Sequence, residues 1–174
     1  MNESTISPIL AIGALLTVGA SVAMALGAGA PGATSLRALL LRQGRWLSFA
    51  VAGTAMAASL YYSEGAGFVP CEFCWYQRIA MYPLAVILLV AGITRDDRVA
   101  KYVMPIAAIG LALSVYHYQC QVFPEQGGSC SSSVPCTARY VEEFGFISIP
   151  FMAGCAFLSV LALQLGMIRA RRAA

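Results

Sequence analysis

Two cysteines separated by two residues stand directly before a long apolar segment, and this spacing suits thiol–disulfide chemistry. Pro70 precedes the pair and favours a helix that begins here, because the N–H that proline lacks needs no partner in the first helical turn. In such a helix Cys71, Cys74 and Arg78 lie within a stripe of about 60°. The free backbone N–H groups and the positive end of the helix dipole stabilise a thiolate there, and Arg78 adds a cation. A Cys-x-x-Cys pattern also fits half of a zinc site or a structural disulfide.

A second cysteine pair, Cys130 and Cys136, lies in the only long loop of the chain, residues 119–146. Two dithiol pairs on one face of a protein suggest electron transfer by thiol–disulfide exchange, in which a thiolate attacks a sulfur through a mixed disulfide. Zinc is the main chemical alternative, because four cysteines can coordinate it tetrahedrally. The wide and unequal spacing disfavours zinc, so we predict no metal at this site, while static disulfides remain a second alternative.

Four other residues have more than one interpretation. Arg78 is either functional, because charge within an apolar span is costly, or a side chain that extends to the membrane surface. His117 is the single histidine and is either structural or close to the reaction centre. Cys120 is inert, reactive or paired with a loop cysteine, and Cys155 is most simply a small apolar packing residue.

The composition is that of a membrane protein. The chain has 174 residues, of which 59% are hydrophobic and 11% charged, whereas about 25% of the residues of a soluble domain are charged. A membrane-spanning helix needs about 20 apolar residues, with a range of about 17–25. Five apolar segments meet this requirement, approximately residues 8–30, 46–62, 75–93, 102–118 and 147–168. The composition therefore predicts an all-α membrane protein that forms a single helical bundle.

The basic residues predict how the chain lies in the membrane. They form three groups: Arg37, Arg42 and Arg45; Arg95, Arg98 and Lys101; and Arg169, Arg171 and Arg172. These are nine of the eleven lysines and arginines, and only Arg78 and Arg139 lie on the other side. Because basic loops stay inside, the N-terminus and the loops 63–74 and 119–146 are expected outside and the C-terminus in the cytoplasm. Cysteines on the outer face fit an oxidising compartment, and topology explains the basic residues without a nucleic-acid partner.

The ends of the chain and the long loop give further predictions. Residues 1–10 lack lysine and arginine, so the first apolar segment is interpreted as a retained helix and not as a signal peptide. Residues 1–45 then comprise an extra transmembrane helix and a basic cytoplasmic linker, and residues 46–174 the main bundle. Within the loop, Ser133 and Pro135 favour a short helix near Cys136 that would lie on the membrane. Its apolar side would comprise Tyr140, Val141 and Phe144.

Two separated motifs carry a family resemblance. Cys71-x-x-Cys74-Trp-Tyr-Gln-Arg78 is followed by Met81-Tyr82-Pro83-Leu84, and Val134-Pro135-Cys136-Thr137 by Phe144-Gly145-Phe146-Ile147-Ser148-Ile149-Pro150-Phe151. These residues closely resemble the disulfide bond formation protein B (DsbB) family, most closely its short-loop branch BdbC, over residues 46–168. The order of the motifs argues against the vitamin K epoxide reductase family, whose loop pair precedes its Cys-x-x-Cys motif.

The resemblance implies a DsbB-like four-helix transmembrane bundle, here with one additional N-terminal transmembrane helix. It implies a quinone-dependent thiol oxidase in the bacterial cytoplasmic (inner) membrane, which reoxidises a DsbA-like thioredoxin-fold thiol oxidase. Electrons would pass from Cys130/Cys136 through Cys71/Cys74 to a membrane quinone, ubiquinone or menaquinone.

The resemblance also implies a role for each site residue. The partner thiolate would attack Cys130, Cys136 would link transiently to Cys71, and Cys74 and Arg78 would face the quinone. We place His117 with Arg78 and Cys74 among the candidate quinone-binding residues. The alternatives are a membrane scaffold with structural disulfides or zinc, and a thiol relay that runs in the reducing direction. The extra helix and Cys120 have no counterpart in the family pattern.

Overall fold

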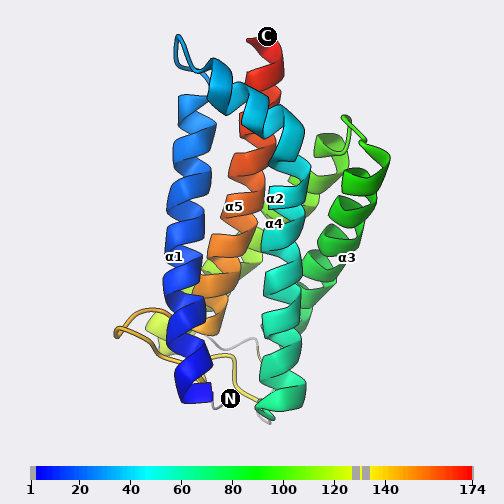
Figure 1. Ribbon diagram of the computed structural model, residues 1–174. Coiled ribbons are helices and arrows are strands. Elements are labelled where there is room, and N and C mark those ends of the chain that lie inside the picture. The colour runs from blue at the N-terminus through cyan, green and yellow to red at the C-terminus, as the bar shows by residue number, and fades with distance from the viewer. Residues whose placement is uncertain (1–2, 127–129, 131–133, 174) are drawn as a thin grey trace.

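The computed structural model describes residues 3–126, 130 and 134–173, and this part of the chain is almost entirely helical (Figure 1). Its five α-helices are α1 (Glu3–Gly27), α2 (Thr34–Leu60), α3 (Glu72–Thr94), α4 (Ala100–Val122) and α5 (Ile149–Arg172). A π-helical turn, Tyr61–Gly65, extends α2, and a 3-10 turn, Pro124–Gln126, follows α4. The described residues contain no strand beyond one isolated bridge between Glu143 and Ile147. The all-α prediction is confirmed.

Four of the helices form a ring, and α1 lies outside it. α2 contacts α3, α3 contacts α4, α4 contacts α5, and α5 returns to α2. α1 packs mainly on α5 and contacts α2 only slightly. In Figure 1 the N-terminus and the connection between α4 and α5 lie at one end of the bundle, and the C-terminus lies at the other. The predicted four-helix bundle with one additional N-terminal helix is therefore the observed fold.

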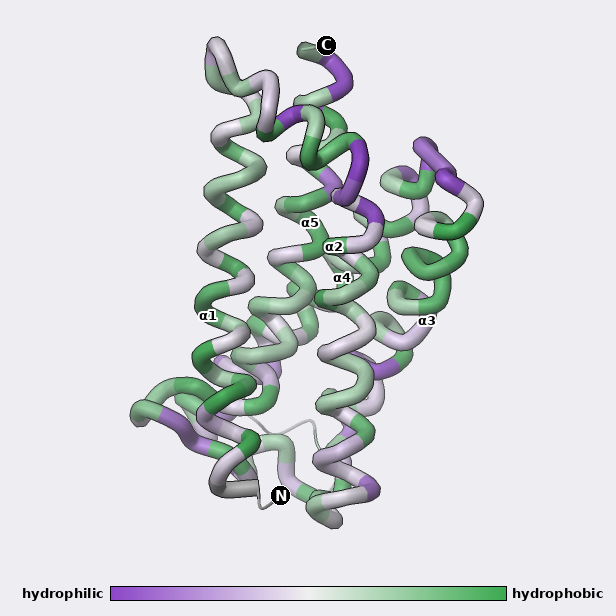
Figure 2. The backbone as a smooth tube through the Cα atoms, viewed as in Figure 1, coloured by the Kyte–Doolittle hydropathy of each residue, from purple (hydrophilic) through white to green (hydrophobic). Residues whose placement is uncertain are grey.

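Four helices are long and apolar enough to span a membrane: Thr5–Gly27, Glu72–Thr94, Ala100–Val122 and Ile149–Arg172. α2 is not among these four, because the basic residues Arg37, Arg42 and Arg45 occupy its first half. The residues predicted as a linker thus belong to the same helix as the apolar segment 46–60. Figure 2 shows hydrophilic residues concentrated toward the two ends of the bundle, with largely hydrophobic helices between them.

Close packing between α4 and α5 depends on a glycine. Phe157 of α5 is fully buried, and its ring lies against Gly110 of α4. A Cβ atom at Gly110 would lie 2.2 Å from the Phe157 Cε1, far inside van der Waals contact. Leu84 and Leu88 of α3 belong to the same buried core. This core holds α3, α4 and α5 together and so helps to fix the position of the Cys71–Cys74 pair at the start of α3.

The short helix predicted after Cys136 is wrong. Residues 134–148 form turns, and the backbone reverses between Glu143 and Ile147, which exchange hydrogen bonds of 2.8 and 2.9 Å. The reversal passes through Phe144 and Gly145, with φ angles of 53° and 78°. These left-handed conformations close a tight turn and cannot continue a right-handed helix. Ser133, the predicted N-cap, lies outside the described residues.

Candidate functional site

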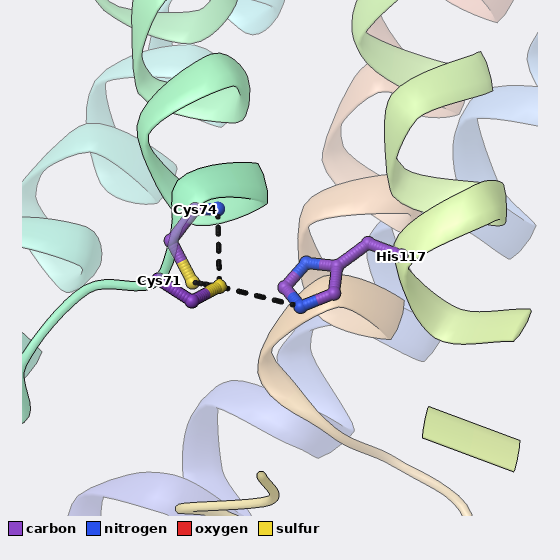
Figure 3. Close-up of side chains that lie close together, drawn as sticks. All are labelled: Cys71, Cys74 and His117. Carbon is purple, nitrogen blue, oxygen red and sulfur yellow. Dashed lines mark hydrogen bonds between the residues drawn. The ribbon is translucent and has the colours of Figure 1, made fainter. Parts of the chain in front are cut away.

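The Cys71–Cys74 pair lies at the start of α3, as the sequence predicts. Cys71 is the N-cap residue, with φ −73° and ψ 174°, and its Sγ accepts a hydrogen bond of 3.4 Å from the backbone N–H of Cys74. The two sulfur atoms lie 2.8 Å apart, between a covalent bond and an ordinary contact (Figure 3). Both are free thiols in this structure. The backbone therefore holds the pair where a disulfide can form with little movement.

His117 lies beside Cys71. Its Nε2 is 3.5 Å from the Cys71 Sγ, and its ring is tilted against Phe73 with centroids 5.6 Å apart. Both Cys71 and His117 are buried, with exposed fractions of 4% and 2%. The hydrogen bond from Cys74 lowers the pKa of the Cys71 thiol well below its ordinary value, and His117 lowers it further, while burial opposes both. In the dithiol form, Cys71 is thus favoured as the thiolate.

Arg78 is held by Ser59 of α2. Its Nε donates to the Ser59 Oγ at 3.0 Å, and its Nη2 donates to the Ser59 carbonyl oxygen at 2.9 Å. Its guanidinium carbon also lies 5.3 Å from the centroid of the Trp75 ring, within cation–π range. Among the described residues, Arg78 Nη1 has no hydrogen-bond partner. One edge of the guanidinium is thus fixed, and the other is able to bind an acceptor.

Cys74 and Arg78 line a largely apolar cavity of about 490 Å³. Its walls come from α1, α2, α3 and α5, and the few polar groups near the two residues include Ser59 and Gln77. Ligand pockets of about 300–1,000 Å³ with apolar walls and a few directed polar groups suit drug-sized molecules. A quinone has a flat ring, two acceptor oxygens and an apolar tail, so these residues fit it. His117 does not line this cavity and lies on Cys71 instead.

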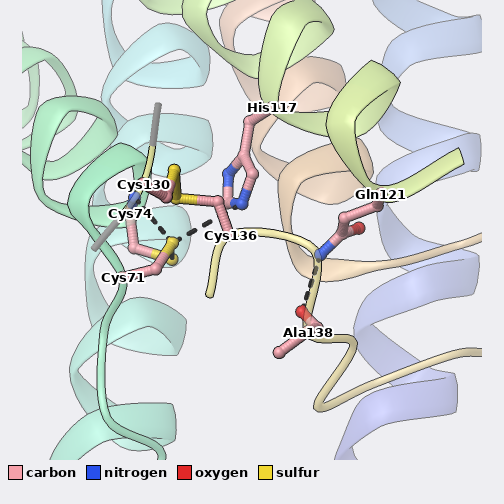
Figure 4. The surroundings of a disulfide bond; sticks show 7 residues. All are labelled: Cys71, Cys74, His117, Gln121, Cys130, Cys136 and Ala138. Carbon is pink, nitrogen blue, oxygen red and sulfur yellow. Dashed lines mark hydrogen bonds between the residues drawn. A yellow bond between two sulfur atoms is a disulfide. The ribbon is translucent and has the colours of Figure 1, made fainter. Parts of the chain in front are cut away.

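The loop cysteines form a disulfide. The Cα atoms of Cys130 and Cys136 are 5.9 Å apart, Cys136 is 1% exposed and Cys130 is half-buried. Figure 4 shows this bond near Cys71, Cys74 and His117. Pro135, next to Cys136 in the chain, lines a small cavity of about 20 Å³ together with these three residues. The disulfide therefore lies near the Cys-x-x-Cys pair.

Gln121 and Arg139, which no motif in the sequence singles out, hold the loop against α4. Gln121 Nε2 donates to the Ala138 carbonyl oxygen at 3.0 Å (Figure 4). Arg139 Nη2 donates to the Gln121 carbonyl oxygen at 2.8 Å. One signal was present in the sequence: Gln121 is four residues after His117 and so lies on the same helix face.

The two remaining cysteines are buried and free. Cys120 is 1% exposed and is not paired with a loop cysteine, because the loop cysteines pair with each other. Cys155 lies within α5, in keeping with a packing role. A metal ion could be held only by Cys71, Cys74 and His117 among the described residues, whose ligand atoms lie within 4.8 Å of one another.

Comparisons with known proteins agree with this geometry. The sequence model of the family "Disulfide bond formation protein DsbB" matches residues 41–167. The "Probable disulfide formation protein" of Oceanobacillus iheyensis is 54% identical over 118 residues, which cover 66% of this chain and 81% of that protein. The "Disulfide bond formation protein C" of Bacillus subtilis is 50% identical over 118 residues, which cover 67% of this chain and 86% of that protein. The "Probable disulfide formation protein C" of Halalkalibacterium halodurans is 44% identical over 131 residues, which cover 74% of this chain and 93% of that protein.

No solved structure matches the chain at a significant level. The family match begins within α2, so α1 precedes it. The bundle of apolar helices carries paired cysteines at one end, and the family model matches most of its length. The chain is therefore a multi-pass membrane protein with a thiol–disulfide oxidoreductase role, and it belongs to the DsbB family.

Proposed function

We propose that this protein is a quinone-dependent thiol oxidase that reoxidises a DsbA-like thioredoxin-fold protein outside the bacterial cytoplasmic membrane. One observation carries the proposal. The Cys130–Cys136 disulfide lies near the Cys71–Cys74 pair (Figure 4), with Pro135 and both thiols lining one small cavity, while Cys74 also opens into an apolar cavity beside Arg78. The site therefore connects a partly exposed disulfide to a membrane-embedded cavity through a single pair of thiols.

The loop disulfide takes electrons from the partner. A partner thiolate attacks the half-buried Cys130, a mixed disulfide forms, and Cys136 leaves as a thiolate. Cys136 then attacks Cys71 of an oxidised Cys71–Cys74 pair, which releases Cys74 as a thiolate. The second partner thiol resolves the mixed disulfide and frees Cys130. Cys130 attacks Cys136, which restores the loop disulfide and leaves Cys71 and Cys74 reduced by two electrons.

The reduced pair then faces the cavity. A quinone bound there would accept two electrons and two protons and leave as quinol, and the Cys71–Cys74 disulfide would be restored. The chain's own part is electrostatic: Arg78 places a fixed cation at the cavity wall, where it stabilises negative charge on Cys74 or on a bound oxygen. His117 serves Cys71 in this scheme, because its Nε2 contacts that sulfur.

The charge distribution supports the proposed orientation. The three basic groups, at the start of α2, around the α3–α4 connection and at the end of α5, lie at the end opposite the cysteines. The positive-inside rule then places the cysteines outside and the C-terminus in the cytoplasm. The quinone would be ubiquinone or menaquinone, and the partner a soluble protein whose thiol reaches Cys130.

The test is a turnover assay. The purified protein, a reduced thioredoxin-fold partner and a defined quinone are mixed, and quinone reduction is followed by absorbance. We expect one quinone reduced per partner disulfide formed, with turnover abolished in Cys74→Ser and retained in Cys120→Ser, a matched control at a buried free cysteine. Undiminished turnover in Cys74→Ser would sink the proposal.

Two rival functions make different predictions. A zinc scaffold needs four ligands, and the described residues bring only three together. Two thiolates on one tetrahedral zinc lie about 3.8 Å apart, as follows from Zn–S bonds of about 2.3 Å, whereas these sulfurs are 2.8 Å apart. Stoichiometric zinc in the purified protein would favour the scaffold. A relay in the reducing direction would require quinol to reduce the partner disulfide, which the same assay run in reverse detects.

A further inference from the structure

We infer that α1, the helix that precedes the family match, forms a wall of the quinone cavity and directs the quinone tail into the membrane. The inference rests on the proposed function. Nothing in the chemistry of the cysteines requires α1, because Cys71, Cys74, Arg78 and His117 all lie on α3 and α4 or at their ends. The role of α1 therefore has to come from what it encloses.

One face of α1 lines the cavity that Cys74 and Arg78 line. The contributing residues are Ile9, Leu10, Gly13, Ala14 and Thr17. Their spacing, at steps of three and four residues with adjacent pairs, is that of a single helical face. On α2 the wall runs from Ala50 to Ser59, the residue that holds Arg78. The cavity thus extends from the guanidinium to the surface of α1.

α1 is fixed at both of its ends. At the outer end, the Tyr62 hydroxyl donates to the Ser7 Oγ at 3.1 Å, and both residues are at least 95% buried. At the inner end, Arg169 Nη1 donates to the Ala25 carbonyl oxygen at 3.0 Å. Gly166 allows this approach, because a Cβ there would lie 3.3 Å from the Ala25 Cα. The helix is therefore a built part of the bundle and not a loosely attached anchor.

The space between α1 and α2 gives the tail its path. Both helices pack on α5, which lies between them in Figure 1, and they contact each other only slightly. The cavity reaches this region, since residues of α1, α2 and α5 all contribute to its lining. A quinone ring at Cys74 and Arg78 would extend its apolar tail between α1 and α2 into lipid. α1 would then determine which tails and ring substituents fit.

Gly13 offers a direct test, because a side chain there enters the cavity without a clash. Gly13 lines the cavity, and a Cβ built on it has no neighbour within 4 Å. Gly19 also has no neighbour within 4 Å, but it is exposed and does not line the cavity. Gly13→Leu and Gly19→Leu therefore add the same side chain to the same helix, inside and outside the cavity.

The measurement is quinone bound to the purified protein, by extraction and by titration of tryptophan fluorescence with a short-tailed ubiquinone. We expect Gly13→Leu to lower quinone affinity about tenfold or more, because filling a cavity displaces its ligand. Gly19→Leu should bind as the unmodified chain does. Disulfide exchange between the reduced partner and the Cys130–Cys136 pair, measured without quinone, should continue in both variants. Equal quinone affinity in the two variants would overturn the inference.

The result separates this inference from the proposed function. If the unmodified chain binds no quinone, the proposed function fails; if it binds quinone and Gly13→Leu binds equally, only the role of α1 fails. Should Gly13→Leu not fold, photolabelling of the unmodified chain with an arylazido-quinone decides. We expect label on residues 9–17 and on α2 or α5. Label confined to α3 and α4 would show that α1 is no part of the site.

Discussion

The Nε2 of His117 lies 3.5 Å from the Sγ of Cys71, and His117 does not line the cavity that Arg78 and Cys74 share. The two basic side chains near the Cys-x-x-Cys pair therefore serve different sulfurs. His117 contacts Cys71, and Arg78 shares a cavity with Cys74. Under the proposed function, this division would let Cys71 exchange with the loop while Cys74 faces the quinone cavity.

Replacing His117 should raise the pKa of Cys71. In His117→Leu the hydrogen bond from Cys74 remains, but the contribution of His117 is lost. A cysteine is mainly thiolate above its pKa, so Cys71 of the reduced unmodified protein should still be alkylated fast as the pH falls from about 8 to about 6. In the variant, the Cys71 alkylation rate should fall by up to about tenfold for each pH unit. The measurement is iodoacetamide alkylation of the Cys71 peptide by mass spectrometry.

The control for this experiment is Tyr116→Phe, a neighbouring change on an exposed part of α4. Coincident pH profiles for His117→Leu and the unmodified protein would show that His117 has no electrostatic role at Cys71. A parallel loss of rate at every pH would indicate a change in access to the sulfur instead.

Arg78→Lys should weaken quinone binding and leave the loop chemistry intact. Lysine keeps the charge but cannot make the two directed bonds to Ser59, and a hydrogen bond to a charged group contributes about 1.5–3 kcal/mol. We expect the KM for quinone to rise at least about tenfold. Exchange between the partner and Cys130–Cys136, assayed without quinone, should proceed at the unmodified rate. An unchanged KM would remove Arg78 from the quinone site.

Gly110→Ala should destabilise the bundle. The added methyl group would lie 2.2 Å from the Phe157 ring, and overpacking of a core costs about 1–3 kcal/mol. Gly154→Ala is the matched control, because its Cβ would meet Ser114 at an ordinary 3.5 Å. Thermal unfolding in detergent should show a lower midpoint for Gly110→Ala alone, and Phe157→Leu should partly restore it. Equal midpoints for the two alanine variants would contradict the packing described.

The local features of the site could be predicted from sequence because they depend on residues close together in the chain. Pro70 and the Cys71 N-cap are adjacent, so the helix start at the cysteines was predictable. The length and composition of the apolar segments were enough to predict a bundle of membrane-spanning helices. The family motifs gave the order of the two cysteine pairs, and the structure shows the second pair joined as a disulfide.

The contacts between distant segments could not be predicted in this way. Ser59 holds Arg78 from another helix, and no pattern in either segment indicates the pairing. The loop helix was wrong because contacts with α4 and within the loop outweighed the local start signals: the Ala138 carbonyl oxygen accepts from Gln121, and the Glu143 N–H bonds to the Ile147 carbonyl oxygen instead of to a preceding turn. His117 was grouped with the quinone-binding residues, but the side of the pair on which it lies depends on how α3 and α4 pack.

The difference in burial between the loop cysteines predicts which one the partner attacks. Cys130 is half-buried, whereas Cys136 is 1% exposed. A partner that keeps only its attacking cysteine, activated as its mixed disulfide with thionitrobenzoate, should therefore link to reduced Cys136→Ser, through Cys130 and with release of thionitrobenzoate, at least about tenfold faster than to reduced Cys130→Ser, since exchange rates depend on access to the sulfur. Non-reducing electrophoresis and peptide mapping identify the linkage. Cys120→Ser should trap as the unmodified chain does, and equal trapping by the two loop variants would show that burial does not select the sulfur.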